Sequence, residues 1–484
     1  MSRIITSEEE LSTDVVVVGG GGAGMAAAIS AREGGAKTVL LEKRGKLGGT
    51  GVMATGIFAA ESPVQKRMMI DAPRDLFFRE AMDYAHWTIN PLIVRAFVDK
   101  SGETIQWLEG KGVEFDWIQP LYPNQVPPVQ HCPKGRGAGL MKALARNCRE
   151  SGVQLLTDAT AKRILVNEKE GVTGVQAEIK EKKVIVHARS VIIATGGYGG
   201  NKELLKKYCP SYSDDLKCIG LPNTGDGILM ATEIGAATEG LGLLLWLGPA
   251  ALSPILRTII MEPSLILVNK KGERFTDENL SCHFERGNPL SRQPDKICYA
   301  LFDSKIKQNI TSDGLKRPGW GLPRHKEHLL PQIEIADLEK ELKLQADKGI
   351  VRISDSWLEI AKWLGISPKI LESQINEYNS FCDKGHDDIF VKDPRYLIAL
   401  RTPPYYAINC FLGYLNTLGG IRINHHMEVL NHNDKPIPGL YAAGVDTGGW
   451  ESGSYGGAKL PGSALGFAVN SGRIAGENAA EYIS

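Results

Sequence analysis

An unbroken run of β-branched residues that stops at a glycine cluster constrains this chain more than any other feature. Val15–Val18 is typical of a strand buried on both faces, and Gly19, Gly21 and Gly24 follow it with the spacing G-x-G-x-x-G. The first glycine permits a tight turn, the second lets backbone approach a pyrophosphate, and the third packs a helix against the strand. The Ala-rich segment that follows predicts that helix, whose N-terminus favours phosphate anions. The pattern therefore predicts a dinucleotide-binding unit.

A carboxylate at the end of the next predicted strand supports the same interpretation. The apolar segment 37–42 ends in Glu42, about 18 residues after Gly24. An acidic side chain at this distance accepts hydrogen bonds from the hydroxyls of an adenosine ribose. Three glycines alone would also fit an ordinary turn in an α/β protein. The prediction of a dinucleotide-binding unit therefore depends strongly on Glu42.

A second glycine-rich segment, 43–51, follows the acid at once, where a simple NAD domain would continue into another βαβ unit. Three later motifs are Ala194-Thr195-Gly196-Gly197 after a predicted strand at 190–193, Thr224-Gly225-Asp226-Gly227-Ile228, and Pro438-Gly439-Leu440-Tyr441-Ala442-Ala443-Gly444. In this order the motifs resemble those of FAD-binding flavoproteins. Specifically, the chain resembles the fumarate reductase, succinate dehydrogenase and 3-ketosteroid dehydrogenase superfamily, over almost its whole length.

The resemblance implies FAD as the cofactor, with contacts spread over all of these motifs. The implied contacts are Gly19, Gly21, Gly22, Ala23, Gly24, Glu42, Lys43, Gly49, Thr50, Gly51, Ala161, Thr195, Gly196, Asp226, Gly444, Val445, Asp446, Ala464 and Leu465. Val445 stands where relatives often have a glutamate, with Asp446 next to it. The histidine that carries covalent FAD in some relatives is missing from the segment 49–51, so FAD is expected to be non-covalent.

The expected fold class is α/β, with a discontinuous Rossmann-like FAD-binding domain and an inserted α+β capping domain. A chain of 484 residues is too long for one ordinary core. The expected division is 1–240 for the first part of the FAD-binding domain, with a helical insertion at 61–150, then 241–395 for the capping and substrate domain, and 396–484 for the second part of the FAD-binding domain. Four prolines in 117–128 predict an irregular loop at the rim of the site.

Composition excludes several other classes of protein. Lys plus Arg and Asp plus Glu both number 56, so no excess charge suggests a nucleic-acid partner. The eight cysteines include no C-x-x-C pair, and His425-His426 is expected in a solvated loop, so no metal site is predicted. The apolar run 241–254 is too short and too broken by prolines to span a bilayer, and is expected to line an apolar cleft. No secretory signal pattern is visible, so a cytoplasmic protein is expected.

The residues that grip two carboxylates in fumarate reductases are altered here. Asn416 and Gly248 stand where those relatives have histidines, and Lys459 and Lys307 align with arginines. Lysine is a point charge and cannot copy the planar fork of arginine. These differences make a dicarboxylate substrate less favoured.

The segment 453–458 instead resembles the Tyr-x-Gly-Ala stretch of 3-ketosteroid dehydrogenases, which implies that Tyr455 holds a substrate ketone; packing in a glycine-rich loop is the alternative. His283 stands near the position of that family's second tyrosine and is the candidate acid or base, although it also fits a surface histidine. Tyr122 is the candidate supporting tyrosine, and Trp246 and Trp450 are expected to wall the substrate site.

These observations predict an FAD-dependent oxidoreductase that adds or removes hydrogen across a C=C bond conjugated to a ketone, with an unidentified electron donor or acceptor. One alternative is a fumarate reductase-like enzyme for an unsaturated carboxylic acid, in which Lys459, Lys307 or Arg292 would converge over the flavin. Another is an electron-transfer flavoprotein subunit without a substrate pocket.

Overall fold

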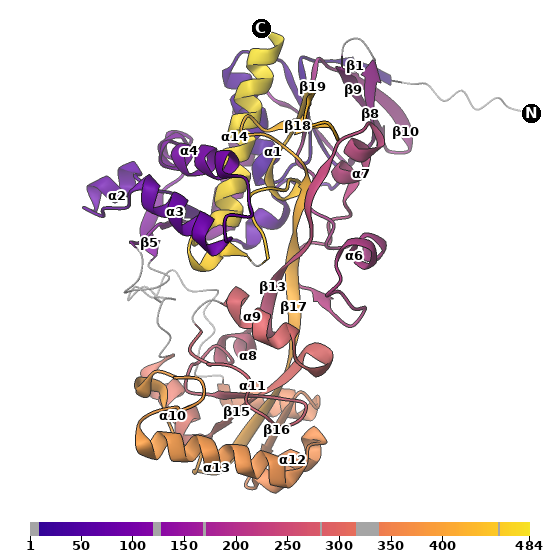
Figure 1. Ribbon diagram of the computed structural model, residues 1–484. Helices are drawn as coiled ribbons and strands as arrows, with labels where there is room; N and C mark the ends of the chain where they lie inside the picture. Colours follow the sequence, from indigo (N-terminus) through magenta and orange to yellow (C-terminus); the bar gives the residue numbers. More distant parts are fainter. Residues whose placement is uncertain (1–8, 120–126, 168–170, 281–282, 316–337, 454) are drawn as a thin grey trace, which may run out of the picture.

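The computed structural model describes residues 9–119, 127–167, 171–280, 283–315, 338–453 and 455–484. In Figure 1 these residues form two halves stacked along one long axis. Two long strands, β13 (Thr238–Ala250) and β17 (Tyr405–Ile421), pair with each other and run from one half into the other. The expected α/β class with an FAD-binding fold is confirmed.

The first half is built on a six-stranded sheet in the order β18-β19-β11-β2-β3-β7. Neighbouring strands from β19 to β7 are parallel, and β18 is antiparallel to β19. Val15, Val16 and Val17 are completely buried, as the apolar pattern of a strand covered on both faces requires. The bounds are β2 (Val15–Val18), β3 (Thr38–Glu42), β7 (Gln154–Thr157), β11 (Ser190–Ile193), β18 (Glu428–Leu430) and β19 (Pro436–Ala442).

The first and the last helix of this half pack together at unusually short range. They are α1 (Gly22–Glu33) and α14 (Ser463–Ile483), which lie side by side in the upper half of Figure 1. A Cβ atom on Gly472 would lie 2.2 Å from the carbonyl oxygen of Ala23, so only glycine fits this position of α14. The glycine lets the two backbones touch, and this fixes the N-termini of both helices beside the sheet.

The remaining elements of the first half surround this core. A four-stranded sheet in the order β1-β10-β9-β8 and a three-stranded sheet in the order β4-β6-β5 flank it. The elements are β1 (Glu9–Ser12), η1 (Gly49–Met53), β4 (Ile57–Phe58), α2 (Pro63–Arg67), α3 (Arg74–Tyr84), α4 (Pro91–Gly110), β5 (Phe115–Gln119), β6 (Gln130–Pro133), α5 (Arg136–Glu150), β8 (Ala159–Asn167), β9 (Gly171–Ile179), β10 (Lys182–His187), α6 (Lys202–Tyr208), β12 (Lys217–Cys218), α7 (Asp226–Glu233), η6 (Gly444–Asp446) and η7 (Gly456–Ala458).

The segment 153–161 contributes to two strands, because Asp158, with a φ of +54°, divides it, so that β7 joins the central sheet and β8 joins another sheet. One local expectation was wrong. The segment 117–128 was expected to be irregular throughout, but its first residues belong to β5, where Trp117 and Ile118 pair with Cys132 and His131. The prolines begin only after that strand.

The second half contains a mixed sheet whose central strand is β17. The first part of β17 pairs with β15 and β16, and its second part pairs with β13. Because β17 and β13 run through both halves, the domain boundaries near residues 240 and 395 stay predictions. The elements are α8 (Pro254–Ile259), β14 (Ile266–Asn269), α9 (His283–Ser291), η2 (Pro294–Lys296), β15 (Ile297–Asp303), α10 (Ser304–Asp313), α11 (Leu338–Asp347), β16 (Val351–Ser354), α12 (Trp357–Leu364), α13 (Pro368–Lys384) and η5 (Pro394–Tyr396). In the described ranges no helix is both long and apolar enough to cross a membrane.

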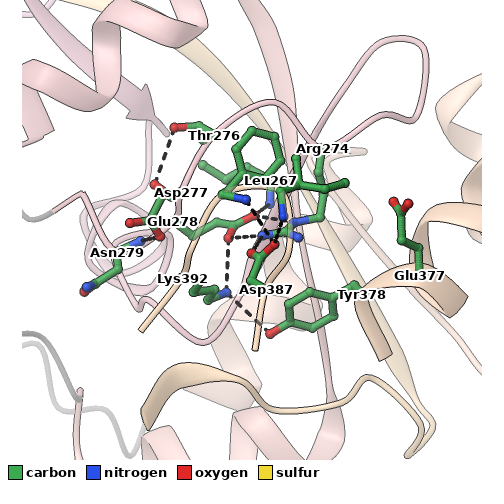
Figure 2. A network of polar contacts seen from close by, with 12 residues as sticks. Leu267, Arg274, Thr276, Asp277, Glu278, Asn279, Glu377, Tyr378, Asp387 and Lys392 are labelled. Atoms are coloured by element: carbon green, nitrogen blue, oxygen red, sulfur yellow. Dashed lines mark hydrogen bonds and ion pairs between the residues drawn. The ribbon is translucent and has the colours of Figure 1, made fainter. Parts of the chain in front are cut away.

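Four buried charges tie this second half together (Figure 2). Arg274 donates to Glu278 and to Asp387, each at 2.9 Å, and the ammonium group of Lys392 lies 3.1 Å from Glu278. Lys392 also donates to the carbonyl oxygen of Leu265 at 2.9 Å. The network joins the chain after α13 to the segment that leads from β14 to α9, and therefore fixes where α9 begins.

The two cations determine the ionisation of the two acids in this network. Burial pushes the pKa of Glu278 upward, but Lys392 and Arg274 outweigh it and hold that pKa below its ordinary value. The pKa of Asp387 is also lowered, because Arg274 and two backbone N–H groups outweigh the effect of burial. An acid whose folded-state pKa is depressed stabilises the fold above its unfolded pKa and loses this contribution as the pH falls. The network should therefore weaken below about pH 4.

We expect Glu278→Gln to lower the free energy of unfolding by about 3–5 kcal/mol at pH 7, because it leaves two buried cations with one acid. Urea unfolding between pH 3 and pH 7 measures this, and the variant should also show a flatter loss of stability in the acid range. Glu359→Gln, which removes an exposed partner of Lys362 on α12, is the control and should behave like the wild type. Equal stability of Glu278→Gln and Glu359→Gln would contradict the role given to the network.

We also expect Gly472→Ala to lower the melting temperature. Alanine ordinarily stabilises a helix by about 1 kcal/mol relative to glycine, but here its methyl group must push two backbones apart. Gly110→Ala is the matched control, because a Cβ there meets no atom within 4 Å. Differential scanning calorimetry of the two variants separates these effects, and a more stable Gly472→Ala protein would refute the close helix contact.

Candidate active site

One cavity of about 750 Å³ collects nearly all of the cofactor contacts predicted from the sequence. Its wall is formed by the end of β2, the end of β3, η1, the start of β8, the end of β11, the start of α14 and parts of the second half. The predicted residues on this wall are Gly19, Gly21, Gly22, Ala23, Glu42, Lys43, Gly49, Thr50, Gly51, Ala161, Thr195, Gly196, Asp226, Gly444, Val445, Ala464 and Leu465. The fold thus brings together residues from both ends of the chain.

The three glycines of the first turn have different surroundings. Gly19 has a φ of +111°, and a Cβ there would lie 2.1 Å from the carbonyl oxygen of Ala194. A Cβ on Gly24 would lie 1.8 Å from the carbonyl oxygen of Gly19, so this glycine packs α1 onto the turn and does not reach the cavity. A Cβ on Gly21 would meet no atom within 4 Å. The open side of Gly21 therefore faces the space that a pyrophosphate would need.

Charged side chains organise the end of the cavity that follows β3. Glu42 accepts hydrogen bonds from the N–H of Gly20 at 2.7 Å and of Arg44 at 2.8 Å, and so joins two loops. Lys43 donates to Asp226 at 2.8 Å and to Thr224 at 2.6 Å, which ties β3 to the start of α7. These contacts hold the end where the adenosine part of a dinucleotide is expected.

Asp446 lies behind the cavity wall. It is completely buried and accepts hydrogen bonds from the N–H of Gly196 at 2.8 Å and from the hydroxyl of Thr195 at 3.1 Å. Burial raises the pKa of Asp446 to about 7, although these donors oppose the rise. Val445, and not Asp446, is on the wall of the cavity, so Asp446 positions the turn that follows β11.

Tyr455 lies on the cavity wall and is almost completely buried. Its hydroxyl oxygen accepts hydrogen bonds from the N–H of Ala464 at 3.0 Å and from the hydroxyl of Ser463 at 3.1 Å, at the start of α14. The edge of its ring meets Phe284 of α9 with ring centroids 4.8 Å apart. Glu451 accepts a hydrogen bond from the N–H of Gly456 at 2.9 Å and closes the loop that carries the tyrosine. The side chain is thus fixed between the two halves.

Lys459 and the two alternative cations, Lys307 and Arg292, are not on the cavity wall. Lys459 forms an ion pair with Glu80 at 3.0 Å, and Lys307 pairs with Glu339. Tyr122 lies outside the described residues. α9 begins at His283, whose side chain also lies outside the description.

Trp246 and Trp450 were expected on the wall of the substrate site, but neither is on the cavity wall. Trp450 stacks on Phe467 with ring centroids 4.2 Å apart and donates to the carbonyl oxygen of Thr447, and Trp246 is buried against Gly287. Both rings fill core space that α14 and α9 leave beside them. Trp117 is on the cavity wall instead, as are Asn416 and the apolar residues Leu245 and Leu247. The expectation that 241–254 lines an apolar cleft is therefore confirmed for part of that segment.

Two arginines on the cavity wall were not predicted from the sequence. Arg136 opens α5, and Arg257 belongs to α8. Burial lowers the pKa of Arg136. Arg257 had one recognisable signal, since it is a single cation within the apolar stretch 251–261. Arg136 had none, because a cation at the start of a helix is usually solvated.

In the parts of the chain that the structure describes, no group of three or more His, Cys, Asp or Glu side chains is arranged to hold a metal ion. The donors around the cavity are backbone N–H groups, hydroxyls and cations, which suit a phosphate-bearing organic cofactor.

The chain belongs to the family whose model is described as "FAD binding domain", which matches residues 14–465. FAD is the cofactor, and the protein is a flavin-dependent oxidoreductase acting on CH–CH groups. The vinyl phenol reductase of Lactiplantibacillus plantarum is 31% identical over 472 residues, which cover 94% of each chain.

Two solved structures show the same architecture. The open conformation of a flavocytochrome c3 fumarate reductase has a TM-score of 0.75 at 27% identity, over 98% of this chain and 79% of that one. The 3-ketosteroid-Δ4-(5α)-dehydrogenase of Rhodococcus jostii RHA1 has a TM-score of 0.77 at 23% identity, over 99% of both chains. The resemblance to the superfamily and to its 3-ketosteroid dehydrogenase-like branch is confirmed.

We expect Gly21→Val to weaken FAD binding by at least about 10-fold, because its side chain would occupy the space beside the turn that the phosphates need. The melting temperature of the FAD-free protein should hardly change, since a Cβ on Gly21 touches nothing. Titration of FAD-free protein with FAD, followed by flavin fluorescence, measures the effect. Gly110→Val is the control outside the cavity, and unchanged FAD affinity in Gly21→Val would contradict this placement of the phosphates.

Proposed function

We propose that this enzyme adds or removes hydrogen across a C=C bond conjugated to an oxygen function of ketone or phenol type, and that the loop of Tyr455 holds that oxygen. The position of Tyr455 carries the proposal. Its side chain is on the wall of the FAD cavity and is fixed by two donors at the start of α14, a short step from the predicted flavin contacts Ala464 and Leu465.

The chemistry of such a substrate explains why a fixed hydroxyl is useful. Bound FAD supplies hydride transfer. In an enone, hydride arrives at the β-carbon and negative charge develops on the ketone oxygen. In a 4-vinylphenol, protonation of the terminal vinyl carbon and loss of the phenolic proton first give a quinone methide, and hydride addition to its benzylic carbon then puts the charge on the ring oxygen. A hydrogen-bond donor aimed at that oxygen stabilises the charge in either case. Tyr455 is proposed to be this donor, because two hydrogen bonds accepted by a hydroxyl orient it and polarise its O–H bond. Leu245, Leu247 and Phe284 are proposed to exclude water from the reacting carbon atoms.

The relatives support an oxygen of either kind. The name of the Lactiplantibacillus plantarum relative describes an alkene attached to a phenol ring, and the Rhodococcus structure describes a ketosteroid. The lysines that the sequence aligned with carboxylate-binding arginines are engaged with Glu80 and Glu339. Their engagement supports a substrate other than a dicarboxylate.

A reductase for an unsaturated carboxylic acid is the second candidate. Arg257 on the cavity wall favours it, as does the similarity to a fumarate reductase structure. An electron-transfer subunit is less well supported, because the cavity extends beyond the cofactor residues to side chains of the second half such as Leu245 and Phe284. We also propose a cytoplasmic protein with non-covalent FAD and a separate electron donor or acceptor. The described cysteines are all free thiols, which supports a reducing compartment.

Reoxidation of the photoreduced flavin under anaerobic conditions tests the function. Enones and 4-vinylphenols should restore the oxidised absorbance bands, and fumarate should not. Acid precipitation of the same preparation should release FAD into the supernatant. Reoxidation by unsaturated acids alone would refute the proposal in favour of the second candidate, and reoxidation by none of these compounds would refute both.

We expect Tyr455→Phe to lower kcat/KM by about 100-fold for a substrate found in this way, since the variant loses one donor to the developing oxyanion. FAD content should be retained, because the ring still packs on Phe284, and the melting temperature should fall by only a few degrees, because two buried hydrogen bonds are lost. Tyr482→Phe removes an exposed hydroxyl near the end of α14 and serves as the control. Steady-state kinetics distinguish a tyrosine that donates a hydrogen bond to the substrate from one that only packs. An unchanged kcat/KM in Tyr455→Phe would show that Tyr455 only packs.

A further inference from the structure

The charged side chains on the cavity wall fall into two groups. Most of them lie at the end of the cavity where the cofactor is expected, on the turn after β3 and at the starts of α5 and α7. These are Glu42, Lys43, Arg44, Lys46, Arg136 and Asp226. From β13 to the start of β17, the described residues on the wall are Leu245, Leu247, Arg257 and Phe284. Within the described residues of this second half, Arg257 is thus the single charge that faces the cavity.

Arg257 is held in place by its backbone and not by an acid. Ser253 is the N-cap of its helix α8: the Ser253 hydroxyl accepts a hydrogen bond from the N–H of Leu256 at 3.3 Å and donates one to Glu341 of α11. Leu256 and Ile259 are buried beneath the helix. The Nε of Arg257 donates to the carbonyl oxygen of Ala251 at 3.4 Å, and among the described residues no ion pair joins its guanidinium group to a carboxylate. The two Nη groups have no described partner.

An arginine in this situation suits a particular ligand group. The planar guanidinium presents parallel N–H donors that match the two oxygens of a carboxylate, or one phenolate oxygen. Arg274, by contrast, donates a hydrogen bond to a neighbouring acid, Glu278. Here the surroundings on the same wall are Leu245, Leu247 and Phe284, which suit a hydrocarbon body. In Figure 1 α8 and α9 lie on the side of the second half that faces the FAD-binding half.

We propose that Arg257 determines specificity by binding one anionic oxygen group on an otherwise apolar substrate. The proposal rests on the proposed function, because it places the substrate between the flavin and the second half. It deepens that function by requiring a substrate with one anionic oxygen, a carboxylate or a phenolate. A single arginine on an apolar wall fits one such group and not the two of a dicarboxylate.

Binding of saturated, product-like compounds to the oxidised enzyme tests the inference independently of alkene reduction. Oxidised holoenzyme is titrated with two matched pairs, 3-phenylpropanoate against 3-phenylpropanamide, and 4-ethylphenol at pH 10.5 against 4-ethylanisole, and the flavin absorbance is followed. The wild type should prefer the anion in at least one pair by about 10-fold or more, and the pair that shows the preference identifies carboxylate or phenolate as the group. Arg257→Gln should abolish that preference while the neutral member binds as before.

Two further variants keep the result interpretable. Arg257→Lys retains the charge without the planar fork and should keep only part of the preference. Arg395→Gln removes an exposed arginine of the second half that pairs with Asp393, and should bind both pairs like the wild type. FAD content and melting temperature of each variant confirm folding.

The inference is overturned if the wild type shows no preference in either pair, or if the preference survives in Arg257→Gln. Its failure can be told apart from failure of the proposed function. An Arg257-dependent preference in an enzyme whose reduced flavin is reoxidised by no conjugated alkene would leave the binding role standing and refute the reaction. Reoxidation by enones in an enzyme without the preference would do the reverse.

Discussion

Backbone contact at the glycine turn is the constraint on which the rest of the structure depends. The third glycine of the turn, Gly24, would drive a Cβ into the carbonyl oxygen of Gly19, and Gly19 itself lies against Ala194. These contacts bring the end of β2, the start of α1 and the end of β11 to one point. Gly472 then allows α14 to touch α1, so the C-terminal helix contributes its N-terminus to the same cavity. Many N–H groups thereby meet where an anionic cofactor needs them.

The strands β13 and β17 connect the two halves, so that the cavity has one wall from each half. They pair over much of their length and carry the second half of the molecule on their far ends (Figure 1). The wall from the FAD-binding half is rich in glycine and charge, whereas the described residues on the wall from the second half are apolar apart from one arginine, Arg257. The buried charges around Glu278 in Figure 2 hold the segment before α9, and α9 in turn sets Phe284 against Tyr455. Stability of the second half and geometry of the site are thus linked.

The sequence predicted what local chemistry dictates and missed what only tertiary contacts decide. The glycine turn, Glu42 and the start of α14 were predictable, because glycine spacing and strand patterns report backbone needs directly. Asp446 was expected to contact the cofactor, but it lies one layer behind and holds the turn at Gly196. The direction in which Lys459 points depends on Glu80, some 380 residues earlier in the chain, which no local pattern reveals. Arg257 carried one local signal, a single cation within the apolar stretch 251–261, but tertiary packing decides that it faces the cavity.

A crystal structure of the holoenzyme with 3-phenylpropanoate would show whether one cavity holds cofactor and substrate end to end. We expect the following arrangement: FAD phosphates beside Gly21, the isoalloxazine ring against Ala464 and Leu465, and the ligand between that ring and the apolar wall of Leu245 and Phe284. An isoalloxazine ring that itself fills the space at the apolar wall, with the ligand bound elsewhere, would contradict it.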